Sequence, residues 1–392
     1  MSRYSYYTLE LTAKGPVFVG SGQSANKKEF LYMPDKGEAG RIAFVDMDKV
    51  LSYISGLDEK FVKWFEMLLL NDGALKNVSY NGIKGSDCLT NGLYKFLKMT
   101  DTPDEVINSF TEYEIDNDGV FSEERTLCEI KRFMRGADGR IYIPGSSVKG
   151  MLRTALIQHL IRNHPDKNRL FEFRANDSIK YLSKTGDTIE EQLINTLTLK
   201  KTRDKKNFDT RSPLNSIMRG LRVSDSAPLP ESSLTVCRKI DMNAKIGSCD
   251  RIIARECLRP GTTVSFEISV DTNLFRPYNI SVGFAELFGE MVNGFDEEYN
   301  AFYLTHFPEA DELYEPFLFL GGGSGYFSKN IVYTRSGFEK GLEIVSGKIM
   351  KKNDKEEYGI SPHTLKITEY RGRTCQMGLC GVRLKKREGA GF

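Results

Sequence analysis

Long apolar runs are missing from this 392-residue sequence, and no hydrophobic stretch approaches the ~20 residues that a helix needs to cross a bilayer. Residues 1–7 also lack the apolar segment of a secretory signal peptide. We therefore expect a soluble, cytoplasmic protein. Hydrophobic residues make up 40% and charged residues 28%, which is typical of a globular fold, and the length is sufficient for two domains.

A large excess of charge is absent as well. The 55 Lys and Arg residues nearly balance 53 Asp and Glu residues, so the net charge is +2. Any surface that binds nucleic acid must therefore be a local patch rather than a field over the whole molecule.

Metal-binding motifs are also missing. The seven cysteines include no Cys-x-x-Cys pair, which favours reduced, structural thiols in a cytoplasm. A zinc site at Cys375 and Cys380, which are five residues apart, is the alternative. Asp46 and Asp48 could hold Mg²⁺, but two carboxylates are few ligands for such an ion. We expect no bound metal and no cofactor.

Catalytic motifs are equally scarce. The four histidines stand in no hydrolase motif, and no Ser/His/Asp or Cys/His order can be recognised. The spacing of His159 would allow a general base, although a structural histidine within a helix is the simpler interpretation. We expect no enzymatic activity.

The stretch Arg140–Arg153 reads Arg-Ile-Tyr-Ile-Pro-Gly-Ser-Ser-Val-Lys-Gly-Met-Leu-Arg. Its strand-type residues followed by Pro-Gly predict a strand and a sharp turn. Ser146 or Ser147 is expected to cap a helix that runs to about Arg162, where Asn163-His-Pro165 ends it.

The start of this helix is a candidate anion site, because it has unpaired N–H groups and a partial positive charge. Lys149 and Arg153 are four residues apart and share a face. Gly145 and Gly150 would let another backbone come close. The alternative is an ordinary strand–helix junction with solvated cations.

Four segments resemble the RAMP superfamily of CRISPR RNA-binding proteins, in the order of that family. They are Gly15–Gly22, Pro144–Arg153, Glu256–Glu267 and Leu320–Tyr326. Together they span residues 15 to 326, which is most of the chain. Within the superfamily, the length, the motif order and the segment Arg222-Val-Ser-Asp-Ser226 look most like the fifth Csm subunit of type III-A effector complexes.

The resemblance implies an α/β (α+β) fold with two ferredoxin-like (RRM-like) domains of antiparallel sheet, glycine-rich loops and an inserted polar segment. We place the N-terminal domain at residues 1–226, with insertions near 75–125 and 165–220. The C-terminal domain would be 227–392, because Ala227-Pro-Leu-Pro230 makes a stiff break.

The resemblance also implies a function in antiviral defence. The chain would be a non-catalytic, RNA-binding subunit of a type III-A CRISPR interference (Csm) complex. It would bind the guide RNA (crRNA) backbone near its 3′ end, cap the filament of repeated RAMP backbone subunits and support crRNA maturation. Its partners would be single-stranded crRNA, other Csm subunits and a trimming ribonuclease, with no membrane involved.

The alternative function is a RAMP-type endoribonuclease that processes CRISPR repeat RNA by acid–base catalysis. Such an enzyme would need a histidine near the glycine-rich loop, and His306 stands fifteen residues before Gly321.

The expected RNA contacts come from the glycine-containing segments and from basic strand residues. They are Gly20, Ser21, Gly22, Gly145, Ser146, Ser147, Lys149, Arg153, Arg222, Arg238, Lys239, Gly321, Gly322, Gly323, Ser324, Gly325, Tyr326 and Lys329. Tyr326 and Phe327 could stack a base. The alternatives are a β-hairpin turn at 15–22 and a flexible hairpin tip at 321–325.

Charged segments add further expectations. Lys200–Arg222 contains eight Lys or Arg and two Asp, which suggests an insertion bordering an RNA groove or, alternatively, a disordered charged loop. The acidic stretch 101–118 should face solvent or a basic partner. Lys27 and Lys28 could touch phosphate, and Arg383–Arg387 is expected to be a weak electrostatic arm.

Hydrophobic periodicity predicts the regular elements. Strands are expected at 7–12, 42–45, 222–226, 234–240, 264–270 and 317–320, and helices at 58–70 and 281–292. Trp64 is interpreted as a core residue of the first of these helices.

Overall fold

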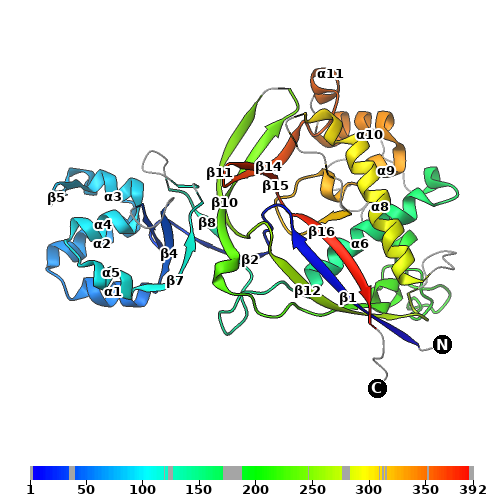
Figure 1. The fold of residues 1–392 in the computed structure, drawn as a ribbon, viewed down its shortest axis with the longest axis horizontal. Coiled ribbons are helices and arrows are strands. Elements are labelled where there is room, and N and C mark those ends of the chain that lie inside the picture. Colours follow the sequence, from blue (N-terminus) through cyan, green and yellow to red (C-terminus); the bar gives the residue numbers. More distant parts are fainter. Residues whose placement is uncertain are drawn as a thin grey trace.

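The structure is a computed structural model that describes residues 3–34, 40–118, 120–121, 127–170, 188–245, 247–275, 283–308, 310, 313, 316–350 and 353–387. Two sheets and the helices beside them form the larger part, and a helical unit projects from one end (Figure 1). No helix within these ranges is long and apolar enough to cross a membrane.

Strands from both ends of the chain form the first sheet, in which all neighbours are antiparallel. In order, they are β13 (Phe317–Phe319), β16 (Leu379–Lys386), β1 (Tyr4–Ala13), β12 (Thr263–Asp271) and β9 (Leu221–Val223). Leu9 of β1 is buried between Phe266 of β12 and Leu384 of β16, its register partners. The strands predicted at 7–12, 264–270 and 317–320 are confirmed.

The second sheet is built around two long antiparallel strands, β10 and β11. In order, its strands are β2 (Gly20–Ala25), β8 (Ile130–Phe133), β11 (Ser248–Leu258), β10 (Leu234–Asn243), β7 (Thr111–Asp116), β4 (Arg41–Val45) and β3 (Phe30–Met33), with β14 (Thr364–Tyr370) paired to β10 and to β15 (Arg373–Gln376). Only the pairs β7–β10 and β8–β11 are parallel among the described pairings. The strands predicted at 42–45 and 234–240 are confirmed.

Helices lie beside the first sheet and bury its apolar face. They are α6 (Gly145–Arg162), α8 (Phe284–Phe302), α9 (Val332–Ser336) and α10 (Phe338–Ile344), followed by α11 (Asp354–Tyr358). The rings of Phe284 on α8 and Tyr7 on β1 are 5.3 Å apart, and α6 packs on α8. The helix predicted at 281–292 exists but continues to Phe302, and residues 281–282 lie outside the described ranges.

The helical unit, residues 47–109, packs around a second hydrophobic core, which also includes Leu31 of β3 and Val45 of β4. It contains α1 (Met47–Ser55), α2 (Glu59–Leu70), α3 (Gly85–Asn91), α4 (Leu93–Met99), α5 (Asp104–Ser109) and the small hairpin β5 (Ser79–Tyr80) and β6 (Ile83–Lys84). Trp64 packs against this core, as predicted. The unit begins before the insertion expected near residues 75–125.

Single turns complete the structure. They are η1 (Gly73–Asn77), η2 (Lys167–Arg169), η3 (Pro213–Asn215), η4 (Ile217–Gly220), η5 (Glu231–Ser233), η6 (Leu304–His306), η7 (Phe327–Lys329) and the π-helical η8 (Val345–Met350). Ile141 makes only isolated bridges, to Arg135 and Leu229, so the strand expected at 140–143 is wrong.

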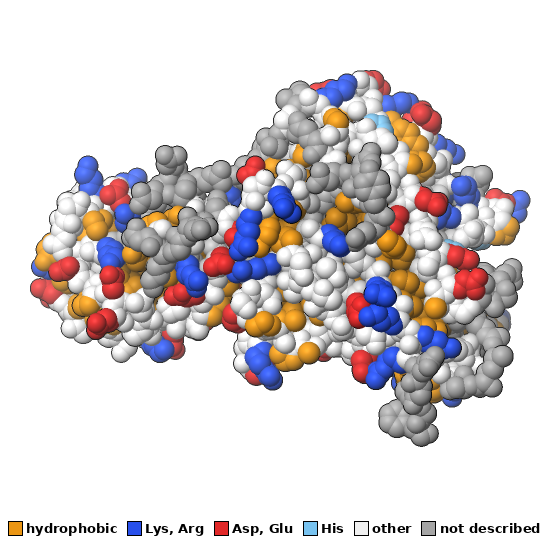
Figure 2. Space-filling view, viewed as in Figure 1, with side chains coloured by type: hydrophobic (Ala, Val, Ile, Leu, Met, Phe, Trp, Pro, Cys, Tyr) orange, Lys and Arg blue, Asp and Glu red, His pale blue; other side chains and the backbone are white. Residues whose placement is uncertain are grey.

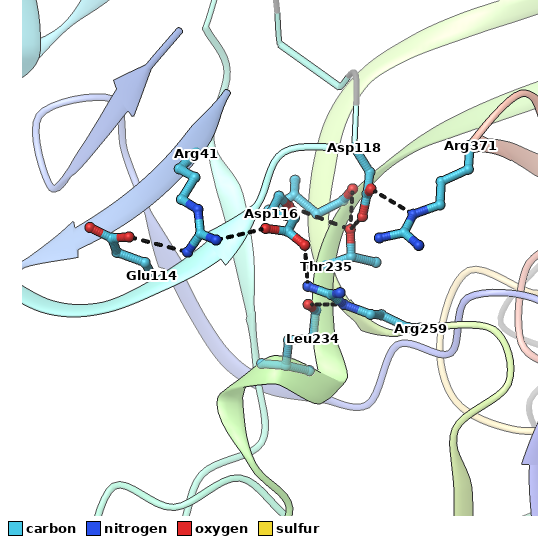
Figure 3. Close-up of polar contacts among 9 residues, drawn as sticks. Arg41, Glu114, Asp116, Asp118, Leu234, Thr235, Arg259 and Arg371 are labelled. Atoms are coloured by element: carbon cyan, nitrogen blue, oxygen red, sulfur yellow. Dashed lines mark hydrogen bonds and ion pairs between the residues drawn. The ribbon is translucent and has the colours of Figure 1, made fainter. Parts of the chain in front are cut away.

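The acidic stretch 101–118 meets arginines of the same chain where the helical unit joins the sheets (Figure 3). Asp116 on β7 accepts a hydrogen bond from Nη2 of Arg259 at 2.8 Å and lies 3.8 Å from Nη2 of Arg41. Asp118 accepts from Nε of Arg371 at 3.2 Å and from the Thr235 hydroxyl. The basic partner expected for this stretch is thus the protein itself.

The basic tail is not an arm. Residues 379–386 form β16, which lies between β1 and β13, and the Lys385 ammonium donates to Glu10 at 2.5 Å. Arg387 donates to Glu267 at 2.6 Å. The expectation failed because residues of the tail such as Leu384 pack inward, while Lys385 and Arg387 pair with acids of β1 and β12.

The fold is of the expected α/β class, with mainly antiparallel sheets. Both sheets take strands from either side of residue 226, so the boundary predicted there does not separate them. The arrangement as two ferredoxin-like domains stays a prediction.

Candidate functional site

Helix α6 begins at Gly145, one residue before the earlier of the two expected caps. Pro144 stands at the N-cap with extended backbone, and Ser146 and Ser147 lie inside the first turn. The Gly145 N–H donates to Oδ1 of Asp225 at 2.7 Å. The predicted serine cap is therefore wrong, because a carboxylate eighty residues away occupies the helix start.

Gly145 is required by crowding at this point. A Cβ added there would lie 2.3 Å from the carbonyl oxygen of Val223, which is closer than any side chain tolerates. The absence of a side chain at Gly145 therefore lets α6 pack against the end of β9 and the residue after it. It does not serve to admit the backbone of another chain, as the sequence had suggested.

A cavity of about 390 Å³ brings three of the four family-like segments together. It is lined by Val19, Gly20, Ser146, Ser147, Gly150, Met151, Thr154, Ala155, Phe295, Leu318, Phe319, Gly321, Gly322, Ser328 and Lys329. Serine and threonine hydroxyls and the ammonium of Lys329 line the cavity together with apolar Met, Leu and Phe side chains. An apolar surface with a few polar groups is the usual character of a ligand site.

The two glycine loops touch each other directly. The Gly322 N–H donates to the carbonyl oxygen of Phe18 at 2.8 Å. Gly321 has φ +85°, and a Cβ there would lie 2.1 Å from the same oxygen. Only glycine permits this contact, which forms one wall of the cavity.

Several side chains of the second loop point into the protein. Ser324 is buried and shares a 2.8 Å hydrogen bond with Ser328. Phe327 is buried against Tyr303, with ring centroids 4.2 Å apart, so the expectation that it stacks a base is wrong. Tyr326 is half-buried, and burial raises the pKa of its hydroxyl. Lys329 lines the cavity.

Lys149, Arg153 and Arg222 gather beside the cavity and do not line it; we call them the basic flank. Burial lowers the pKa of Lys149, and the charges of Arg153 and Arg222 lower it further. Arg153 is 3.1 Å from Glu190. Arg153 and Glu190 line a separate pocket, so the charge of this member of the flank is partly neutralised.

Arg238 and Lys239 lie at an irregularity of β10, where the register with β11 shifts. Arg238 is buried, and Nζ of Lys239 is 3.5 Å from Oδ1 of Asp241. Asp241 also binds Lys366 at 2.7 Å. These two cations are therefore less open to a ligand than their strand positions suggested.

Gly20, Ser21 and Gly22 belong to edge strand β2 rather than to a loop. Ser21 donates to the Arg132 carbonyl at 3.4 Å, and the pairing with β8 is irregular between Gly20 and Ser24. The short family-like loop therefore ends before Gly20, while Gly20 still reaches the cavity.

Lys27 and Lys28 have a structural role that the sequence did not reveal. The Lys28 ammonium donates to the carbonyl of Leu69 at 2.6 Å, and that of Lys27 donates to the carbonyl of Leu89. Both carbonyls belong to the last turns of helices, where cations are favourable. Burial lowers the pKa of both lysines. The expected phosphate contact is wrong, because both ammonium groups are bound to main-chain carbonyls.

The basic segment 200–222 is ordered around the buried Asn215. The side chain of Asn215 accepts from the N–H groups of Leu199 and Lys200 at 2.9 and 2.8 Å, and donates to the carbonyls of Lys200 and Asp209 at 2.8 Å each. The expectation of a disordered loop is therefore wrong for residues 200–222, while a border of an RNA groove stays a prediction. Residues 171–187 of the expected insertion lie outside the described ranges.

The histidines are engaged away from the cavity lining. His159 is buried, burial lowers its pKa, and its Nε2 is 3.7 Å from Glu290. His306 stacks on Phe338, with centroids 5.3 Å apart. Asp46, considered for Mg²⁺, caps α1. Among the described residues, no three His, Cys, Asp or Glu side chains gather as metal ligands.

Two contributors were missed by sequence reasoning: the ring of Phe18 and the guanidinium of Arg255, whose Cζ lies 5.3 Å from that ring's centroid. The available signal was an arginine in a strand whose neighbours two residues away, Ile253 and Cys257, are both apolar. Its meaning depends on which loop covers the strand, and local pattern does not tell that.

Comparison with known proteins agrees with the motif order. A model of the RAMP superfamily matches residues 10–328. The CRISPR system Cms protein Csm5 of Mycobacterium tuberculosis is 30% identical over 395 aligned residues, covering 97% of this chain and 98% of that protein. Csm5 of Streptococcus thermophilus is 26% identical over 360 residues, covering 89% and 87%.

Solved structures share the fold. A chain in the cryo-EM structure of a Csm–crRNA–target RNA ternary complex of a type III-A CRISPR-Cas system has a TM-score of 0.64 and 20% identity, covering 96% of this chain and 100% of that one. The crystal structure of T. onnurineus Csm5 has a TM-score of 0.56 and 18% identity, covering 95% and 99%. The likeness confirms the α/β class.

Proposed function

Because the chain belongs to the RAMP superfamily and, within it, to the Csm5 proteins, we propose that it is a structural subunit of a type III-A CRISPR complex and binds the backbone of single-stranded crRNA. The observation that carries this proposal is the cavity where Gly20, the first turn of α6 and the Gly321–Gly322 backbone meet. Glycine backbone and serine hydroxyls fit a sugar–phosphate chain without reading its sequence.

The position in the complex is part of the proposal. The subunit binds near the 3′ end of the crRNA, caps the filament of repeated RAMP subunits and supports crRNA maturation by recruiting a trimming ribonuclease. A fold shared with a chain of a Csm–crRNA–target RNA complex supports the assembly role. Lys and Arg side chains are interspersed with Asp and Glu over the visible face (Figure 2), so no single-sign field covers it.

The subunit acts without cleaving RNA. An acid–base ribonuclease would need a histidine at the RNA, yet His159 is buried and His306 stacks on Phe338. Neither lines the cavity. These placements support binding rather than catalysis.

A salt titration of the purified protein with labelled repeat-derived RNA tests binding and cleavage together. We expect salt-sensitive binding, because phosphate contacts release counterions, and intact RNA on a denaturing gel of the same samples. Cleaved RNA that persists through repurification would contradict the non-catalytic role, and salt-independent binding would contradict backbone recognition.

Substitutions in the basic flank test where the RNA runs. Lys149→Ala should weaken binding by ~1 kcal/mol and reduce the salt slope by about one unit. Arg153→Ala should cost less, because Glu190 already neutralises part of its charge. Lys63→Ala, on the exposed side of α2, removes the same charge and should change neither quantity. Equal slopes in all three variants would remove the flank from the RNA path.

A further inference from the structure

Residues 199–209 form a short hairpin at the surface, which we call the basic hairpin. Across it, the Thr202 N–H donates to the Asn207 carbonyl at 2.9 Å, and Lys201 and Phe208 are bridge partners. None of its residues lines the cavity of about 390 Å³. Any ligand of the hairpin therefore binds outside the site described above.

Hydrogen bonds hold the basic hairpin in one shape at both of its ends. At the base, the buried side chain of Asn215 binds four main-chain groups of the two hairpin strands. At the tip, the Asp204 carboxylate accepts hydrogen bonds from the Thr202 hydroxyl and from the Lys206 N–H. A surface that is ordered before binding loses less conformational entropy when a ligand binds.

Most of the positive charge on the hairpin is uncompensated. Residues 200–211 contain six Lys or Arg and two Asp, whereas the net charge of the whole chain is +2. Lys200 lies 3.7 Å from Asp209, and Arg211 lies 3.2 Å from Glu191. Four exposed cations form no ion pair within the described part of the chain: Lys201, Arg203, Lys205 and Lys206. The hairpin is thus a local positive patch on a nearly neutral protein.

An exposed aromatic ring lies among these cations. Phe208 is 42% exposed, and no other Phe, Tyr or Trp side chain in the described ranges is as open to solvent. Nζ of Lys201 lies 5.7 Å from the centroid of its ring. A single-stranded nucleic acid fits this combination, because its bases stack on an aromatic ring while its phosphates meet the cations.

A second pocket connects the hairpin with the basic flank. This pocket, of about 750 Å³, is lined by Arg153 of the flank and by Arg211 and Pro213, which follow the hairpin. Glu190 and Glu191 also line it and pair with the two arginines. The pocket gives RNA a path from the flank to the unpaired cations of the hairpin.

We propose that the basic hairpin binds single-stranded guide RNA that leaves the cavity past the basic flank, a role that rests on the proposed RNA-binding function. A base stacks on the ring of Phe208, and the neighbouring phosphates bind the exposed cations of the hairpin. Such contacts hold the strand without reading its sequence.

The experiment titrates the purified full-length protein with labelled repeat-derived RNA at several salt concentrations. Phe208→Ala should bind about tenfold more weakly with an unchanged salt slope, because the ring contributes stacking and no charge. The double variant Lys205→Ala/Lys206→Ala should lower the slope by about 1.4 units, since each phosphate contact to a single strand contributes about 0.7. Phe208→Trp should bind like wild type. RNA should quench its fluorescence more than that of wild type, whose single tryptophan is Trp64.

The double variant Lys63→Ala/Lys340→Ala removes the same charge from exposed positions of α2 and α10 and should equal wild type. Unchanged affinity in both hairpin variants, beside a wild type that binds, would overturn the role of the hairpin alone. So would weaker binding by Phe208→Ala without extra quenching in Phe208→Trp, which indicates a structural ring. Polyglutamate that quenches Phe208→Trp as strongly as RNA does would overturn it in favour of an acidic protein partner. A wild type that binds no RNA would overturn the proposed function as well.

Discussion

Gly321 is the residue on which the contact between the two glycine loops depends most directly. Its Cα faces the carbonyl oxygen of Phe18, where a Cβ would lie at 2.1 Å. Gly22 has the same φ of +85° but no atom within 4 Å of its would-be Cβ. The two glycines share this φ and differ in what an added Cβ would meet.

Gly321→Ala should lower the free energy of unfolding by about 1–3 kcal/mol more than Gly22→Ala does, because only the first substitution forces the loops apart. Urea denaturation of both variants measures the difference. Equal losses would show that the loops do not rely on this contact.

Asp296 on α8 is a second residue with a measurable consequence. Its carboxylate accepts hydrogen bonds from the Phe317 N–H at 3.2 and 3.3 Å, while burial raises its pKa from 3.8 to about 7. In the folded protein it keeps a proton that the unfolded chain releases near pH 4. Stability therefore falls as pH rises from about 4 to about 7.

Asp296→Asn keeps an acceptor for Phe317 and removes this dependence. The melting temperature of the variant should exceed that of wild type by a few °C at pH 8, and the gap should shrink towards pH 5. Scanning calorimetry across this range measures it. Parallel curves would mean that Asp296 does not titrate in this window.

At the level of elements, the first turn of α6 shows how a distant residue replaces a local cap. Asp225 follows β9 and accepts from Gly145 at 2.7 Å, so the helix start is joined to the first sheet. Its carboxylate also neutralises the partial positive charge that a phosphate would otherwise use. The helix start is therefore less available to an anion than the sequence predicted.

Asp225→Ala should cost about 0.5–2 kcal/mol of stability, the range measured for lost helix caps. Asp225→Asn retains an acceptor oxygen and should lose less. Thermal denaturation of the two variants compares them. An alanine variant as stable as wild type would show that the Gly145 N–H finds another acceptor.

The strands and helices that could be predicted from the sequence are those in which the buried apolar residues recur at the spacing of a strand or a helix. Leu9 and Leu11 in β1, and Phe65 and Leu68 in α2, point inward as their spacing indicated. The roles that could not be predicted depend on tertiary neighbours. The carbonyls bound by Lys27 and Lys28, like the helix start bound by Asp225, are remote in sequence from these residues.

At the scale of the whole molecule, the candidate site forms because strands from the two ends of the chain pair in one sheet. Strand β1 from the N-terminus lies between β12 and β16, and this pairing brings the loop after β1 to the loop after β13 (Figure 1). The three cavity segments could be identified from the sequence by their family resemblance. That these segments meet, and that Arg255 lies next to Gly323, could not be predicted from the sequence. Local sequence patterns do not show which distant strands pair.

The helical unit 47–109 contributes no residue to the lining of the cavity. It shares its core with residues of β3 and β4, and it joins the sheets through β4 and β7, with the Asp116 and Asp118 ion pairs at the junction. The arginines of these ion pairs neutralise part of the acidic stretch 101–118.

Photo-crosslinking of guide RNA carrying 4-thiouridine within the assembled complex, followed by peptide mapping, tests the central claim most directly. The account predicts crosslinks from the 3′ part of the guide to peptides containing residues 18–22, 145–155 and 321–329, which meet at the cavity. Crosslinks confined to the helical unit, or absent from all three segments, would contradict it.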